Sequence, residues 1–168
     1  MARQPASGPG MWVLLSYRIP REPSTPRITV WRKLKRLGVA QLGDGLIALP
    51  ADARTREHLD WIAEEIVESG GTATVWLAQP ATAAQERELA TEMAAARRDE
   101  YRVVIDQAAA ADAAPEAERT RTIRRLRDEL RRIQRRDYFP PAERDTARQA
   151  VEAAAQVRTD AHRPEITP

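Results

Sequence analysis

A break in composition near residue 80 limits what this chain can fold into. All four tryptophans lie before the break, whereas arginine and alanine are concentrated after it. A chain of 168 residues can hold a small domain with its own core together with an extension. We therefore predict a domain over residues 11–80 and a helical extension over residues 81–163. Residues 1–10 and 164–168 are predicted to be tails, the first of them flexible.

The first eighty residues show strand and helix patterns in turn. Runs of β-forming residues predict four strands, at residues 12–17, 39–42, 45–49 and 72–77. Gly43-Asp44 predicts a hairpin between the second and third. Apolar residues at helical spacing predict helices that begin near Pro26 and Thr55 and end near Leu37 and Ser69. This order is the ferredoxin-like βαββαβ arrangement of the α+β class.

The tryptophans of the two predicted helices fall within apolar stripes. Ile28, Trp31, Leu34 and Leu37 recur every three residues, and Trp61 lies beside Ile62. We therefore expect Trp31 and Trp61 in the core. Both helices should cover one face of an antiparallel sheet, so the other face needs a cover. The extension or a partner subunit is expected to supply it, since Trp12 and Trp76 would otherwise be partly exposed.

The extension is predicted to hold three helices, at about residues 82–112, 116–136 and 141–160. Pro115 and the run from Asp137 to Pro141 separate them. The second helix has a short apolar seam at Ile123, Leu126, Leu130 and Ile133. The third is lined by alanine, which buries little area. Together with the uncovered sheet face, this favours a homodimer.

Several function classes are unfavoured by composition. The chain has no cysteine and two histidines, so thiol nucleophiles, thiolate zinc sites and histidine-based triads lack their residues. Glu57, Asp60, Glu64 and Glu65 lie on a polar helix face and do not suggest catalysis. We expect no enzyme activity, no metal and no cofactor. No apolar run approaches the roughly 20 residues of a membrane span, and the start lacks a signal peptide, which favours a cytoplasmic protein.

Charge is segregated along the chain. Residues 1–50 carry eight Arg and Lys against two Asp and Glu, whereas residues 51–80 carry two against six. Residues 113–137 carry nine arginines against five acids. Such blocks indicate basic patches for an anionic partner or, alternatively, solvated helix faces and pairing between segments of opposite sign.

Several motifs together resemble one family. They are the run from Trp12 to Ser24, the run from Val30 to Gly38, Gly43-Asp44-Gly45, Leu49-Pro50, residues 54–57 and residues 137–140. The chain resembles the amino-terminal domain of ChrB, a family of regulators of bacterial chromate-resistance operons. The resemblance implies a DNA-associated transcriptional regulator that binds the operator upstream of resistance genes. Full-length members continue into a domain thought to sense chromate, so chromate sensing is not carried over and a separately encoded sensing domain is a possible partner.

A more distant similarity is to small ferredoxin-like nucleases of CRISPR adaptation and to phenylacetate-pathway repressors. Their first strand ends in Tyr-Asp-Ile, where the aspartate supports a metal. Here the tripeptide is Tyr17-Arg18-Ile19. Because a guanidinium cannot ligate a cation, we do not expect a metal nuclease.

The candidate DNA-binding residues are all basic. Arg18 and Arg21 flank Pro20 at a strand end, where two guanidiniums can clamp phosphate oxygens. The remaining candidates are Arg27, Arg32, Lys33, Lys35 and Arg36 of the first helix and Arg124 and Arg131 of the arginine-rich helix. The first helix lacks Asn, Gln and Ser to read base edges, so backbone contact is expected. The alternative is a protein-interaction module whose arginine-rich helix docks a separate acidic or sensor partner.

Overall fold

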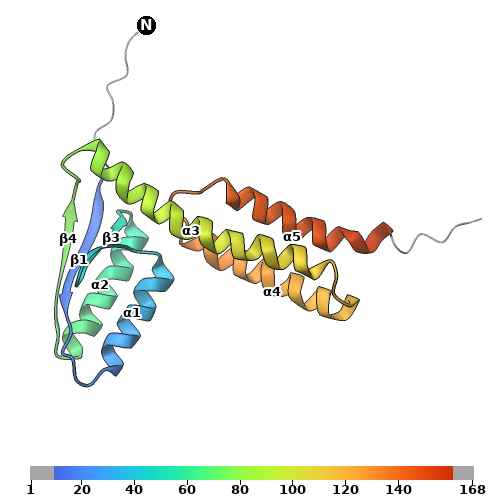
Figure 1. The fold of residues 1–168 in the computed structure, drawn as a ribbon. Helices are drawn as coiled ribbons and strands as arrows, with labels where there is room; N and C mark the ends of the chain where they lie inside the picture. Colours follow the sequence, from blue (N-terminus) through green and yellow to red (C-terminus); the bar gives the residue numbers. More distant parts are fainter. Residues whose placement is uncertain (1–9, 161–168) are drawn as a thin grey trace, which may run out of the picture. The chain divides into compact units, whose positions relative to one another are not determined.

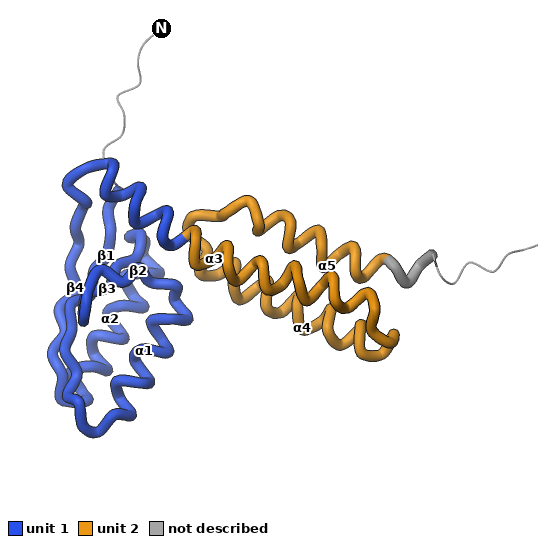
Figure 2. Tube along the Cα trace, in the orientation of Figure 1, with its two compact units in different colours: residues 1–93 blue, residues 94–168 orange. Residues whose placement is uncertain are grey.

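The computed structural model describes residues 10–160, with side chains to residue 156. Figure 1 shows its helices and strands, and Figure 2 its two compact units, residues 1–93 and residues 94–168. The boundary between the units falls inside one helix, beyond the predicted boundary at residue 80. The predicted tails lie outside the described residues, apart from Gly10.

Unit 1 contains four strands and two helices in the predicted order. The strands are β1 (Trp12–Arg18), β2 (Ala40–Gly43), β3 (Leu46–Pro50) and β4 (Thr72–Ala78). The helices are α1 (Thr25–Leu37) and α2 (Ala53–Glu68). The four strands form an antiparallel sheet in the order β2-β3-β1-β4. The structure is thus a mixed α+β fold, and α1 and α2 lie on the same side of the sheet (Figure 1).

The start of α2 is fixed by its own residues. The Asp52 side chain accepts a hydrogen bond from the Thr55 amide at 2.7 Å. The Thr55 hydroxyl accepts one in return from the Asp52 amide at 2.9 Å. This reciprocal capping box satisfies two backbone donors at the start of the helix. The hydrogen bond from the Thr55 amide is the main cause that lowers the pKa of the Asp52 carboxyl.

The core of unit 1 lies between the sheet and the helices. Its fully buried side chains come from β1, β3, α1 and α2: Val13, Leu15, Leu49, Val30, Leu59 and Ile66. The apolar residues of α2 at helical spacing, Leu59, Ile62 and Ile66, are all buried, as an apolar stripe on the second helix predicts, whereas Ala63 is half-buried. These side chains hold α1 and α2 against the sheet by removing apolar surface from water.

The predicted burial of Trp31 and Trp61 is wrong. Trp31 is 55% exposed and Trp61 57% exposed. In α1 the buried residues are Val30 and Leu34, spaced by four. A spacing of three drifts around a helix of 3.6 residues per turn, so Ile28 and Leu37 point to opposite sides. The stripe drawn through Trp31 therefore mixes the buried and exposed faces.

The second face of the sheet is covered at one end. The helix α3 (Ala83–Ala111) begins in unit 1, and its Glu86 accepts a hydrogen bond from the Trp12 indole at 3.1 Å. Trp12 is buried as a result. Trp76 on the edge strand β4 is 53% exposed, and its indole donates to the Ser16 hydroxyl at 3.0 Å. The first turns of α3 therefore cover Trp12 and leave Trp76 exposed.

Up to residue 160, unit 2 consists of helices and the loops that join them. It holds the rest of α3 together with α4 (Glu116–Arg135) and α5 (Glu143–Asp160), close to the three predicted helices. The predicted seam of α4 is confirmed, since Ile123, Leu126, Leu130 and Ile133 are all buried. They form one core with Tyr101, Val104 and Ala108 of α3 and with Ala147, Val151 and Ala154 of α5.

A partly buried polar cluster lies at the loop between α4 and α5. The Tyr101 hydroxyl donates to Asp137 Oδ2 at 2.8 Å. Arg97 and Arg136 both approach Glu100, each at 3.1 Å. Burial raises the pKa of the Tyr101 phenol strongly, and the hydrogen bond to Asp137 adds to this. The cluster ties the end of α4 to α3.

Candidate functional site

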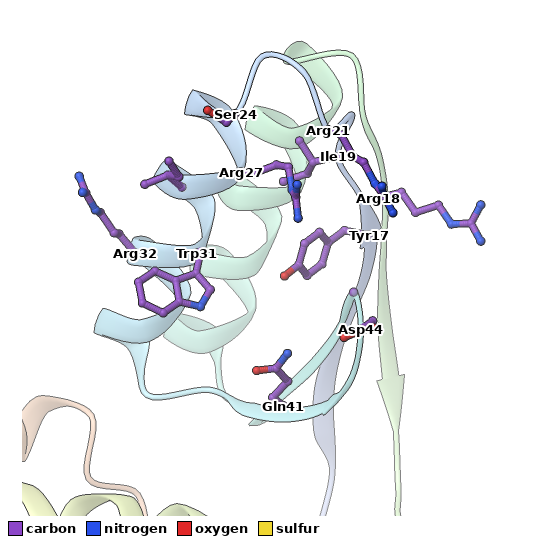
Figure 3. A pocket seen from close by; sticks show the side chains of 12 residues that line it. Tyr17, Arg18, Ile19, Arg21, Ser24, Arg27, Trp31, Arg32, Gln41 and Asp44 are labelled. Atoms are coloured by element: carbon purple, nitrogen blue, oxygen red, sulfur yellow. The ribbon is translucent and has the colours of Figure 1, made fainter.

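A cavity of about 960 Å³ opens in unit 1 where β1 ends (Figure 3). Its walls are the end of β1, the loop that follows, the first turns of α1 and the β2–β3 hairpin. It is lined by Tyr17, Arg18, Ile19, Arg21, Ser24, Arg27, Ile28, Trp31, Arg32, Gln41, Asp44 and Gly45. We call this cavity the β1 cleft.

Four of the nine predicted DNA-binding residues line the β1 cleft: Arg18, Arg21, Arg27 and Arg32. All four are exposed, and none forms an ion pair with another described residue. Asp44 is the one acidic residue among the lining residues. Figure 3 shows Arg27 pointing into the cleft, with Arg18 and Arg32 pointing outward on either side. Positive charge therefore surrounds the opening, and the guanidiniums are available to an anion.

Two aromatic side chains face into the β1 cleft, Tyr17 from β1 and Trp31 from α1 (Figure 3). Tyr17 is half-buried, and this burial raises the pKa of its phenol, although the Arg27 charge opposes the rise. At neutral pH the phenol is therefore protonated and able to donate a hydrogen bond. Trp31 presents more than half of its surface to solvent. The β1 cleft can therefore contact a ligand through aromatic rings as well as through charged groups.

Two glycines hold the end of β1 close to its neighbours. The Tyr17 amide donates to the Gly45 carbonyl at 2.8 Å, and Gly45 has a φ of 70°. A β-carbon on Gly71 would lie 2.4 Å from the Arg18 carbonyl oxygen and 2.8 Å from Ile66 Cγ2. Because a side chain fits at neither position, the hairpin and the start of β4 approach the backbone of Tyr17 and Arg18 closely.

The other basic residues of α1 lie outside the β1 cleft. Lys33 forms an ion pair with Glu65 of α2. Lys35 lies over the Trp31 ring, with its Nζ 5.4 Å from the ring centroid. Arg36 lines a separate cavity of about 280 Å³ between α1 and α2, together with His58 and Trp61. Lys33 is therefore ion-paired within unit 1, whereas Lys35 adds a positive charge beside the exposed Trp31 ring.

The predicted residues of the arginine-rich helix belong to unit 2. Arg131 pairs with Asp128 and Arg132 with Glu129, as their spacing of three predicts. Arg127 pairs with Glu152 of α5 at 3.2 Å. Arg124 is exposed, and no other described residue forms an ion pair with it. Part of the charge on α4 is thus balanced within the three-helix unit.

Sequence reasoning missed the uncharged contributors to the β1 cleft. The sequence pattern predicts Trp31 in the core, and it does not mark Gln41 as a site residue. Tyr17 carried one signal, its position at the end of a strand beside two candidate arginines. Gln41 carries no local signal, because only the pairing of β2 with β3 brings it opposite α1 (Figure 3). Among residues 10–160 no cluster of acidic and histidine side chains could hold a metal ion.

The fold and the cleft define a class of protein: a small α+β domain with a cationic, aromatic-lined cleft, followed by a three-helix unit. Residues 27–163 match the family model described as protein ChrB, N-terminal, and the chain belongs to this family. The curated Protein ChrB of Cupriavidus metallidurans strain CH34 is 29% identical over 140 residues. That match covers 81% of this chain and 43% of the relative, so the chain spans under half of the relative's length.

No solved structure matches the chain significantly. Within the described residues, none of the helices has the length and apolar character needed to cross a membrane. The family match begins at Arg27, so Trp31 and Arg32 lie inside it, whereas Tyr17, Arg18 and Arg21 precede it.

Proposed function

We propose that this chain binds nucleic acid through the β1 cleft and acts as a DNA-associated regulator of the ChrB type, for chromate or other stress resistance genes. The observation that carries the proposal is the set of four exposed arginines around one cavity, without ion pairs to other described residues. Membership of the ChrB family supports the link to resistance genes. The proposed role is non-enzymatic and requires no cofactor or metal.

Phosphate is the ligand that this charge pattern favours. A guanidinium offers several donors in a planar fork that matches two phosphate oxygens. Each phosphate that an arginine neutralises releases condensed counterions, so the affinity falls steeply as salt rises. Such contacts are independent of base sequence. We therefore expect the cleft to supply affinity for the backbone, and we expect operator preference to need further contacts.

We also propose where the protein acts, its oligomeric state and its partners. A cytoplasmic homodimer that binds the operator upstream of resistance genes is the state we expect, with a separately encoded chromate-sensing domain as a possible partner. The exposed Trp76 and Leu77 of edge strand β4 support a second copy as a partner. We also infer that unit 1 is a ferredoxin-like domain, since β1 and β3 are the central strands of its sheet.

Binding to the DNA upstream of its own gene tests the proposal. Affinity is measured by fluorescence anisotropy from low to moderate salt for the wild type and for a variant with Arg18, Arg21, Arg27 and Arg32 changed to alanine. The matched control changes Arg54, Arg56, Arg87 and Arg148, which are exposed residues outside the cleft. The cleft variant should lose nearly all binding and the control little. Absence of binding at low salt, or equal losses in both variants, would contradict the proposal.

The exposed face of α4 favours a second candidate function, docking of an acidic protein partner. Arg124, Arg125 and Arg135 are exposed and have no ion pair among residues 10–160. A pull-down against neighbouring gene products separates the two functions. A complex that forms without DNA and is lost on changing these three arginines to glutamate would favour the docking module.

A further inference from the structure

The β1 cleft combines two kinds of group that phosphate binding alone does not require. Its arginines suit an anion, but Tyr17 and Trp31 present aromatic rings beside them. Trp31 keeps 55% of its surface exposed, although a large apolar side chain gains free energy when it is buried. An exposed ring in a cleft suggests that a flat ligand covers it.

The Trp31 ring lies among polar and charged side chains that a ligand stacked on it could contact. Lys35, one turn further along α1, has its Nζ 5.4 Å from the ring centroid. Opposite, Gln41 of β2 and Asp44 of the hairpin line the cleft, and Figure 3 shows both below the Tyr17 ring. The glutamine amide offers a donor and an acceptor together, the groups that read the edge of a base. The hydroxyl of Tyr17 adds a third polar atom.

The walls of the cleft are set by the backbone. The hydrogen bond from the Tyr17 amide to the Gly45 carbonyl at 2.8 Å joins β1 to the hairpin. α1 is held to the sheet by its buried residues Val30 and Leu34. The cleft is therefore formed before any ligand arrives, and its volume of about 960 Å³ is in the range that small-molecule sites occupy.

We propose that the β1 cleft binds an unpaired nucleotide of a nucleic acid strand, with the base stacked on Trp31 and the phosphate held by Arg21 and Arg27. Aromatic side chains stack on any base whose face is free, and arginines beside them hold the backbone. In a closed duplex the base faces are covered by their neighbours, so Trp31 would find no partner. This inference rests on the proposed function of the same cleft and specifies the state of the nucleic acid it prefers.

Binding of three probes tests the inference: a ten-nucleotide thymidine strand, a duplex of the same length and a thymidine strand with abasic sites in place of all bases. The full chain should bind the thymidine strand more tightly than either of the others. Trp31→Ala should weaken binding of that strand between about fivefold and about a hundredfold, the range measured for loss of one stacked base. Trp31→Phe keeps a ring and should retain most of the affinity.

Trp61→Ala is the matched control, because Trp61 is equally exposed on α2 and does not line the β1 cleft. It should bind all three probes like the wild type. Circular dichroism of each variant checks that it folds. Competition with free thymidine monophosphate distinguishes a site for a single nucleotide from one that needs the strand: displacement at millimolar concentration supports the former.

The outcomes separate the inference from the proposed function. If the abasic strand or the duplex binds as tightly as the thymidine strand, or if Trp31→Ala binds like the wild type, base stacking is overturned. Should binding in those cases still depend on Arg18, Arg21, Arg27 and Arg32, the proposed phosphate contact stands. If no probe binds at low salt, both are overturned.

Discussion

The amide of Tyr17 and the carbonyl of Gly45 are joined by a hydrogen bond of 2.8 Å, at a point where no side chain fits. A β-carbon on Gly45 would lie 2.3 Å from the Tyr17 carbonyl oxygen. Gly45 also has a φ of 70°, in the left-handed region that favours glycine. One contact thus sets the distance between the strand that carries Tyr17 and the hairpin that carries Gln41 and Asp44.

Gly45→Ala should therefore destabilise unit 1. The strained backbone and the contact with the Tyr17 carbonyl should together lower the free energy of unfolding by at least about 1–3 kcal/mol, measured by urea denaturation. Gly43→Ala is the control, because a β-carbon there meets no atom within 4 Å. Its effect should stay within about 0.5 kcal/mol. Equal effects at the two positions would show that the close approach is unimportant.

Loss of one cleft arginine should change the slope of log affinity against log salt by a predictable amount. Arg27→Ala removes the guanidinium that points into the cleft. If it contacts one phosphate, the slope of log affinity against log salt should fall by about 1. Arg54→Ala removes one charge from the exposed surface of α2 and should leave the slope unchanged. The slopes come from anisotropy titrations, and a slope unaffected by Arg27→Ala would place that residue outside the interface.

The pKa of Tyr101 predicts how stability depends on pH in the alkaline range. Because its folded pKa lies above that of an unfolded tyrosine, about 10, the protonated phenol stabilises the fold below that pH, and this contribution is lost as the pH rises beyond it. Wild type should lose more stability than Tyr101→Phe between pH 9 and pH 11 in urea unfolding. At pH 8 the variant should be destabilised by about 1–3 kcal/mol, because Asp137 loses its donor. Parallel pH profiles would refute this.

The capping box of α2 offers a test at acid pH. Asp52→Ala should lower the free energy of unfolding by about 1 kcal/mol at pH 7. Because hydrogen bonding lowers the folded pKa of Asp52, its contribution is present above the unfolded pKa, about 3.9, and is lost as the pH falls through the folded value. The variant and the wild type should therefore converge as the pH is lowered through the folded pKa of Asp52. Glu64→Ala, an exposed change on the same helix, should have little effect at either pH.

Much of the fold could be predicted because glycine and proline mark the ends of its elements. Pro20, Gly38 and Gly70 stand just outside the strands and helices of the structure, and Pro50 is the last residue of β3. The burial of single residues was harder to predict. Ile28, Trp31 and Leu34 look like a stripe, but only tertiary packing decides that Val30 and Leu34 are the pair that faces the sheet.

The charged residues of the candidate site could be predicted from the sequence, but their ion-pair partners in the fold could not. Arg18 and Arg21 stand out because they flank Pro20 at a strand end, and no distant residue is needed to find them. By contrast, Lys33 looked like a free cation, yet its partner Glu65 lies thirty-two residues away on another helix. Pairing across helices depends on how α1 and α2 pack, which the local sequence does not encode.

The close approach of Gly71 to the Arg18 carbonyl has a consequence for how this protein tolerates change. In a saturation mutagenesis screen for binding, position 71 should accept almost no replacement, although it does not line the cleft. Its intolerance would resemble that of a ligand-contacting residue. A screen that also records abundance would sort the two kinds apart: replacements at Gly71 should lower both binding and protein level, whereas replacements at Arg27 should lower binding alone.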